Sequence, residues 1–159
     1  MEKTVCYIGL GSNIGDLKKN LWQAIKEIHL IPDTQIHKIS SFHKTKPYGY
    51  KDQEDFLNAV LEIVTDLSAE KLLEVLQFIE LKMGRVKNFV NGPRVIDIDI
   101  LFYGDNVFIT DQLVIPHHDI DKRNFVLLPM VEIVPDFIHP VLNQSMRELL
   151  DILGTFMQE

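Results

Sequence analysis

Runs of apolar residues along the chain predict four strands. Residues 4–10 (TVCYIGL) and 95–104 (VIDIDILFYG) have the short, nearly continuous apolar pattern of buried strands. Residues 34–45 and 55–66 are predicted as the two strands between them in the sequence. A loop over residues 46–54, which contains proline and glycine, separates these two strands. It is long for a hairpin connection, and long ordered loops are often functional.

Two segments have apolar residues at helical spacing. The first helix is predicted over residues 17–31, with Asp16 as its N-cap and the proline that follows as its end. The second helix is predicted over residues 69–83, with Ser68 as its N-cap and a C-terminal glycine directly after it.

The predicted order of these elements is β-α-β-β-α-β. This is the ferredoxin-like order of an α+β fold, in which helices pack on a mainly antiparallel sheet. Two further helices are expected as C-terminal additions, over residues 125–136 and 143–154, the second closed by Gly154. We expect residues 1–159 to form a single domain.

Charge and composition argue against several classes of function. The 159 residues carry a formal net charge of −7, whereas a nucleic-acid-binding protein usually has a basic face. No run approaches the roughly 20 apolar residues of a membrane helix, and the N-terminal apolar run is too short for a signal peptide. The one cysteine, Cys6, is expected to be a small buried residue in a protein of a reducing compartment. We therefore expect a cytoplasmic protein that binds neither nucleic acid nor membrane.

Two carboxylates interrupt the last apolar strand. Asp97 and Asp99 are two positions apart, so on a strand they share one face about 7 Å apart, while the neighbouring isoleucines line the other face. Carboxylates at this spacing repel each other unless a cation lies between them. Mg²⁺ would relieve the repulsion, because it binds through one or two carboxylates and substrate phosphates. An edge strand with a solvated face is the alternative that this pattern leaves open.

Basic side chains flank the two aspartates in the sequence. Carboxylates that hold a metal, surrounded by cations, suit a polyphosphate substrate, because arginine or lysine neutralises developing charge. Surface cations at ordinary density are the alternative. The residues in question are Arg85, Lys87 and Arg94 before the strand, and His117, His118, Lys122 and Arg123 after it.

The segment GLGSNIGD matches no common nucleotide-binding loop. Its glycines, Gly9, Gly11 and Gly15, lack the dinucleotide spacing, and no lysine of a P-loop follows. We expect a tight turn between the first strand and the first helix, either close to a substrate or purely structural.

Aromatic residues in or beside loops offer a second candidate site. Two of Tyr48, Tyr50, Phe56 and Phe125 could sandwich a flat heterocycle by stacking. Asn58 shares a strand face with Phe56, and its amide could recognise the polar edge of a ring. Ordinary core aromatics are the alternative.

Four segments in order resemble a known family, the 6-hydroxymethyl-7,8-dihydropterin pyrophosphokinases of folate synthesis. The resemblance runs from about residue 4 to residue 140 and leaves no segment for a fused partner enzyme. Its most specific part is G-P-R-x-x-D-x-D-I followed by P-H-x-D. The segments are GLGSNIGD, SSFHKTKPYGYKDQEDFLNAV, GPRVIDIDILFYG and VIPHHDIDKRNFVLLPMVEI.

The resemblance implies a reaction and a set of site residues. The pterin hydroxymethyl group would take a pyrophosphoryl group from ATP with release of AMP, and two Mg²⁺ ions would be held by Asp97 and Asp99. Arg85 and Arg94 would act with the two aspartates as catalytic residues that contact phosphate. The pterin would lie among Thr45, Tyr48, Phe56, Asn58 and Phe125, with Phe56 and Phe125 stacked on its two faces. ATP would contact Gln77, Glu80, Arg85, Lys87, Arg94, Ile100, His117 and Arg123.

The chain departs from the family pattern at four positions. Asn91 replaces a tryptophan that closes over the substrates, and His118 replaces a common tyrosine. Lys87 replaces an arginine and loses its bidentate fork, and Gln112 replaces another arginine and loses its charge.

Two other functions are compatible with the sequence. A non-catalytic ferredoxin-like module would explain the fold but not two aspartates on one strand face with cations around them. A different Mg²⁺-dependent nucleotidyl or phosphoryl transferase would explain both. We expect a monomer whose partners are the small molecules ATP and 6-hydroxymethyl-7,8-dihydropterin.

Overall fold

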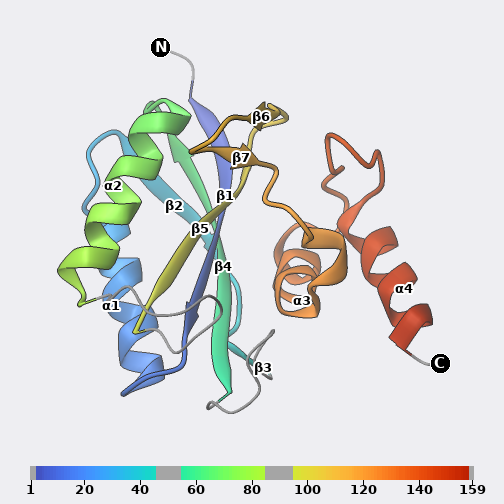
Figure 1. Ribbon diagram of the computed structural model, residues 1–159, viewed down its shortest axis with the longest axis horizontal. Coiled ribbons are helices and arrows are strands. Elements are labelled where there is room, and N and C mark those ends of the chain that lie inside the picture. Colours follow the sequence, from blue (N-terminus) through green and yellow to red (C-terminus); the bar gives the residue numbers. More distant parts are fainter. Residues whose placement is uncertain (1–2, 46–54, 85–94, 158–159) are drawn as a thin grey trace.

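The structure is a computed structural model that describes residues 3–45, 55–84 and 95–157 (Figure 1). Its main sheet has the order β2-β4-β1-β5, with a short strand β3 beside β4, and all of its pairs are antiparallel. The strands are β1 (Thr4–Ser12), β2 (Thr34–Ile39), β3 (His43–Thr45), β4 (Phe56–Thr65), β5 (Asp97–Tyr103), β6 (Phe108–Ile109) and β7 (Val114–Ile115). The helices are α1 (Leu17–His29), α2 (Ala69–Lys82), the 3₁₀ turn η1 (Ile120–Lys122), α3 (Asn124–Ile133) and α4 (Met146–Met157).

The order of the four long strands confirms the predicted ferredoxin-like α+β fold. The segment predicted as one strand over residues 34–45 is divided into β2 and β3, which corrects the prediction. At the break, Ser40 replaces regular pairing: its backbone N–H donates to the carbonyl of Val60 (3.0 Å), and its Oγ accepts from the Val60 N–H (2.9 Å). A hydroxyl thus takes the place of a backbone carbonyl, and the ladder is interrupted.

Both predicted N-caps of the first two helices are present. Asp16 accepts from the Lys19 N–H (3.2 Å), and Ser68 accepts from the Lys71 N–H (3.1 Å). The predicted C-terminal glycine, Gly84, has φ of +91°, which glycine adopts without strain. The first helix is two residues shorter than predicted, because Ile31 precedes a proline and is disfavoured in the helical region.

The prediction of the C-terminal helix, over residues 143–154, is wrong at both ends. It starts at Met146 rather than 143, where Ser145 and Glu148 form a reciprocal capping box: the Ser145 N–H donates to Glu148 Oε1 (2.9 Å), and the Glu148 N–H donates to Ser145 Oγ (3.1 Å). It also continues past Gly154 to Met157, so this glycine does not close the helix.

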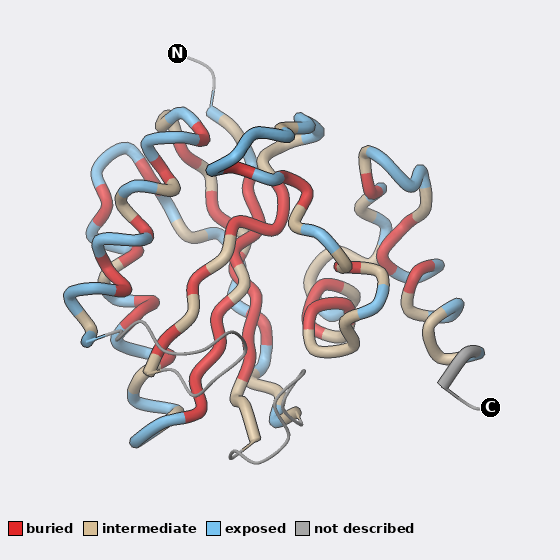
Figure 2. The backbone as a smooth tube through the Cα atoms, viewed as in Figure 1, coloured by how far each residue is buried: buried red, intermediate tan, exposed pale blue. Residues whose placement is uncertain are grey.

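Helices cover both faces of the sheet (Figure 1). One core lies between the sheet and α1 and α2, and it includes Ile8, Leu21 and Leu72. A second core lies between the opposite face and α3 and α4, and it includes Phe102 and Met130. Figure 2 shows buried backbone along the central strands between these two layers. Within the described ranges, no helix has both the length and the apolar character that a bilayer span requires.

Candidate active site

The two aspartates lie on the face of β5 that α3 and α4 partly cover. Ile96, Ile98 and Ile100 are buried in the core beneath α1 and α2, with exposed fractions of 0%, 4% and 5%, whereas Asp97 and Asp99 are half-buried. The predicted division of this strand into an apolar face and an acidic face is therefore confirmed. β5 is also an edge strand, because it pairs only with β1 in the described sheet.

A third carboxylate supports this strand from its free edge. Glu80 of α2 is 5% exposed, and its Oε2 accepts a 2.7 Å hydrogen bond from the backbone N–H of Ile98. Desolvation, followed by the charges of Asp97 and Glu80, raises the pKa of Asp99 well above its usual value, and Arg123 opposes the shift. Three acidic groups thus lie close together, an arrangement that a bound cation would stabilise.

His117 approaches the same carboxylates from a separate segment. Its Nε2 lies 4.0 Å from Asp99 Oδ2, and its backbone N–H donates to the Leu101 carbonyl (3.0 Å). Desolvation lowers the pKa of His117, which favours a neutral imidazole in this position. The ring of His118 stacks on it, with centroids 4.6 Å apart, so this departure from the family pattern keeps an aromatic ring there.

The candidate heterocycle site lies along β3 and β4. Asn58 is 6% exposed, and its Nδ2 donates a 2.5 Å hydrogen bond to Thr45 Oγ1. Phe56 is half-buried and lies opposite Thr45 in the strand pairing. From the N-terminal end of α3, Phe125 packs on the second core, with the guanidinium of Arg123 5.7 Å from its ring centroid.

Two glycines of β1 lie between these two groups, a role that was not predicted from the sequence. Gly11 pairs with both Asn58 and Asp97, and Gly9 pairs with Asp99, so they occupy the strand between the amide and the carboxylates. The predicted turn begins only after Ser12, because β1 continues through Gly11 and Ser12. Two glycines at alternate positions of an apolar strand share one face, and this pattern could have indicated a close approach.

The donor set fits Mg²⁺ with substrate phosphates as further ligands. In the residues that the structure describes, no group of three or more histidine, cysteine, aspartate or glutamate side chains has the geometry of a metal site. Two half-buried carboxylates on one face, Asp97 and Asp99, agree with the way Mg²⁺ binds in phosphate-transfer sites, through one or two carboxylates.

The remaining predicted site residues fall into two groups. Gln77 is exposed on α2, and the side chain of Ile100 is in the core, so only its backbone could contact a nucleotide. Gln112, where the family has an arginine, is exposed between β6 and β7. Outside the described residues lie Tyr48, Tyr50, Arg85, Lys87, Asn91 and Arg94.

Comparison with known proteins gives one consistent result. Residues 7–135 match the family described as 7,8-dihydro-6-hydroxymethylpterin-pyrophosphokinase (HPPK). A 2-amino-4-hydroxy-6-hydroxymethyldihydropteridine pyrophosphokinase of Haemophilus influenzae is 40% identical over 148 residues, which is 91% of this chain and 92% of that protein. The folic acid synthesis protein fol1 of Schizosaccharomyces pombe is 41% identical over 152 residues, 96% of this chain but only 21% of that protein. This chain therefore spans about a fifth of the fol1 relative.

Solved structures agree on the fold. A crystal structure of HPPK-DHPS in complex with substrates superimposes with a TM-score of 0.78 at 14% identity, covering 99% of this chain and 45% of that one. The wild-type Plasmodium falciparum HPPK-DHPS with pteroate gives a TM-score of 0.77 at 16% identity, covering 99% and 43%. The fold and site define an α+β domain with an acidic edge beside a polar, aromatic-lined strand face. The chain belongs to the 7,8-dihydro-6-hydroxymethylpterin-pyrophosphokinase family.

Proposed function

We propose that the chain transfers the pyrophosphoryl group of ATP to the hydroxymethyl group of 6-hydroxymethyl-7,8-dihydropterin and releases AMP. Membership of the family makes it a pyrophosphokinase, and relatives named as folic acid synthesis proteins support a place in folate biosynthesis. The hydroxyl oxygen forms a bond to the β-phosphorus of ATP and gives up its proton to solvent, while the bond from that phosphorus to the bridging α–β oxygen breaks and AMP leaves with that oxygen.

The strand face of β3 and β4 is proposed to bind the pterin. Asn58 is held by Thr45, so its amide is oriented before any ligand arrives. Phe56 and Phe125 come from different elements and would stack on the two faces of the ring, and Tyr48 is proposed beside them. Gly11 of β1 pairs with Asn58 on one side and with Asp97 on the other. Because glycine has no side chain, nothing on β1 separates the Asn58 amide, which would contact the pterin, from the carboxylates.

The acidic edge is proposed to bind ATP with Mg²⁺. Asp97 and Asp99 would hold two ions, with phosphate oxygens completing the coordination. Bound there, Mg²⁺ supplies charge neutralisation and orientation of the triphosphate. The cation Arg123 lies beside the carboxylates, where it can donate hydrogen bonds to phosphate. Nε2 of His117 lies 4.0 Å from Asp99 Oδ2, but Nδ1 of the same ring donates to the His118 carbonyl (2.9 Å), so Nε2 could donate to phosphate only from a protonated ring. Further ATP contacts are proposed for Gln77, Glu80, Arg85, Lys87, Arg94 and Ile100, with Arg85 and Arg94 on the phosphates.

The main support for this proposal is the strand pairing that places Asn58 of β4, Gly11 of β1 and Asp97 of β5 side by side on three adjacent strands. It places the amide that would read the pterin and a carboxylate that would hold Mg²⁺ on either side of one glycine. The alternative of a binding module without catalysis gives no reason for this juxtaposition.

The direct test is product analysis. The protein, incubated with Mg²⁺, ATP and 6-hydroxymethyl-7,8-dihydropterin, should form AMP in a one-to-one ratio with pterin diphosphate, and none without the pterin. Stoichiometric ADP would contradict the pyrophosphoryl transfer, and AMP formed with unrelated alcohols would favour a different transferase.

We also propose that the protein acts as a monomer in the cytoplasm. The single cysteine, Cys6, is a free and fully buried thiol, which suits a reducing compartment. Light scattering at micromolar concentration should give a mass near the 18.4 kDa of one chain, and a twofold larger mass would contradict the monomer.

A further inference from the structure

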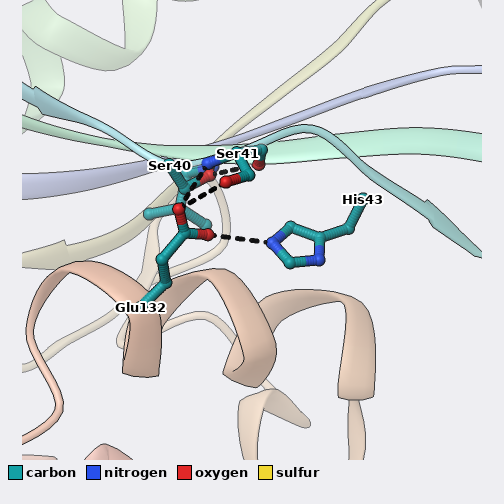
Figure 3. A network of polar contacts seen from close by, with 5 residues as sticks. Ser40, Ser41, His43 and Glu132 are labelled. Carbon is teal, nitrogen blue, oxygen red and sulfur yellow. Dashed lines mark hydrogen bonds and ion pairs between the residues drawn. The ribbon is translucent and has the colours of Figure 1, made fainter.

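One carboxylate joins the C-terminal end of α3 to the segment between β2 and β3 (Figure 3). Glu132 Oε2 accepts hydrogen bonds from the backbone N–H (2.8 Å) and the Oγ (2.6 Å) of Ser41. Its other oxygen, Oε1, lies 3.0 Å from Nε2 of His43. Partial burial alone would raise the pKa of Glu132, yet the hydrogen bonds from Ser41 and His43 lower it, so the ionised form holds the network. Both oxygens of the Glu132 carboxylate therefore bind residues about 90 positions away in the sequence.

The segment that Glu132 holds leads directly into β3. This strand has three residues and pairs only with β4 in the described sheet, so its own ladder supplies few hydrogen bonds. In the pairing, His43 lies opposite Asn58 and Thr45 lies opposite Phe56. Thr45 Oγ1 then accepts the hydrogen bond from the Asn58 amide. A chain of contacts therefore runs from Glu132 through β3 to Asn58.

The other side of this segment is fixed by β4. Ser40 Oγ accepts from the Val60 N–H (2.9 Å) and donates to the Ser41 carbonyl (2.8 Å). This segment is consequently held on one side by β4 and on the other by α3, through the hydrogen bonds of Glu132. Just before it, Lys38 Nζ donates to the Ile133 carbonyl of α3 (3.1 Å), which ties β2 to the same helix. Loss of the carboxylate would remove the described hydrogen bonds of α3 to Ser41 and His43 and leave those of β3 to β4.

We infer that Glu132 is a positioning residue for the pterin half of the site. It fixes β3 so that the Thr45 hydroxyl stands where it orients the amide of Asn58. Glu132 itself lies on a different turn of α3 from Phe125 and is assigned no contact with either substrate. The inference rests on the proposed function, because it assigns pterin recognition to Asn58 and Thr45.

The first test separates the two substrates. Glu132→Ala should raise the KM for the pterin about tenfold and leave kcat and the KM for ATP within about twofold, because misplacement of an orienting group costs binding on that side only. His43→Phe, which keeps the Ser41 contacts, should give a smaller rise in the same parameter. Glu132→Gln, which keeps one acceptor for Ser41, should restore part of the pterin affinity.

A matched control is available on the opposite face of the sheet. Glu27 also joins two elements through its carboxylate, since it accepts from Lys82 Nζ at 2.7 and 3.2 Å and connects α1 to α2. Glu27→Ala should lower the melting temperature to a similar degree and change neither KM. A parallel rise of both KM values in Glu132→Ala would overturn the inference, because a purely structural role predicts it.

The second test needs no turnover. The side-chain amide protons of Asn58 should exchange with solvent at least several-fold faster in Glu132→Ala than in the wild type, and at the wild-type rate in Glu27→Ala. Unchanged exchange in Glu132→Ala overturns the inference, and if that variant does not fold, unchanged exchange in His43→Phe does so. Failure of the wild type to use the pterin would instead refute the proposed function, so the two failures are distinguishable.

Discussion

At the scale of single residues, the site depends on where side chains are missing as much as on where they are present. A Cβ at Gly11 would lie 2.9 Å from Asn58 Oδ1 and 3.5 Å from Phe56 Cδ1, and the first distance is too short for a carbon–oxygen contact. Because Thr45 holds the Asn58 amide on its other side, the amide has little room to move away. Glycine at this position therefore makes room for the Asn58 side chain and is not needed for the strand conformation.

Gly11→Ala should accordingly weaken pterin use. We expect a KM for the pterin about tenfold higher, because the Asn58 amide is displaced. The free energy of unfolding should change by about 1 kcal/mol or less, since the strand conformation needs no glycine. Steady-state kinetics and urea unfolding measure the two effects, and unchanged pterin kinetics would show that this face is not the pterin site.

A second residue-scale prediction concerns the aspartates. Asp97→Asn should lower the rate of AMP formation by about 100-fold or more, because a charged ligand for Mg²⁺ is lost. Its stability without metal should stay equal or rise, since the charge of Asp97 is one of the causes that raise the pKa of Asp99. Asp111→Asn, at an exposed carboxylate, is the control. Near-normal turnover of the Asp97 variant would exclude the metal role.

At the scale of elements, the sequence predicted what local chemistry determines. The caps Asp16 and Ser68 and the alternation of β5 were predicted correctly, because each depends on residues within one turn or one strand. The start of α4 was missed although its signal, a serine followed three residues later by glutamate, is present in the sequence. The division of β2 from β3 was not predictable, because it depends on the hydrogen bond that Ser40 Oγ accepts from the Val60 N–H of β4, 20 positions further along the chain.

The error at the end of α4 leads to a prediction. Gly154 is helical, and no heavy atom would lie within 4 Å of a Cβ built there. Gly154→Ala should therefore stabilise the protein by about 0.5–1 kcal/mol, through lower backbone entropy in the unfolded chain. Chemical denaturation measures this, and pterin kinetics should be unaffected, which makes the variant a control for Gly11→Ala. A loss of stability would indicate that the glycine does end the helix.

At the scale of the whole molecule, one face of the sheet serves two purposes. The end that carries Tyr7, Val60 and Phe102 is covered by α3 and α4 and forms the second core. The other end carries Gly11 and Asp97 and is left for the candidate site. The sequence predicted both C-terminal helices as additions to the sheet but not this division of the face, because no periodic pattern records which strand positions a distant helix covers. The contact of Glu132 with Ser41, 91 positions apart, escaped prediction for the same reason.

The pH dependence of stability should report on the segment between α3 and α4, residues 134–145, which packs against the second core. His139 is 6% exposed and packs edge-on against Phe102, with ring centroids 5.4 Å apart. Its Nδ1 accepts from the backbone N–H groups of Val141 and Leu142, each at 3.1 Å, which only an unprotonated nitrogen can do. Burial lowers the pKa of His139, and the charge of Asp121 opposes the shift.

The sign of the pH dependence follows from this lowered pKa. The unfolded chain takes up the proton near the ordinary histidine pKa of about 6.5, before the folded chain does. The contribution of His139 to stability is complete above that pH and is lost as the pH falls from there through the folded pKa, at up to about 1.4 kcal/mol per pH unit.

His139→Gln cannot be protonated and keeps an acceptor, so its unfolding free energy should fall less steeply between pH 7 and 5. Part of the slope should remain, because the pKa of His117 is lowered as well. His37→Gln, which removes a histidine at an exposed position of β2, is the control. Urea unfolding between pH 7 and 5 measures the free energy of unfolding of each variant. An identical pH slope in the wild type and His139→Gln would assign the acid sensitivity to other groups.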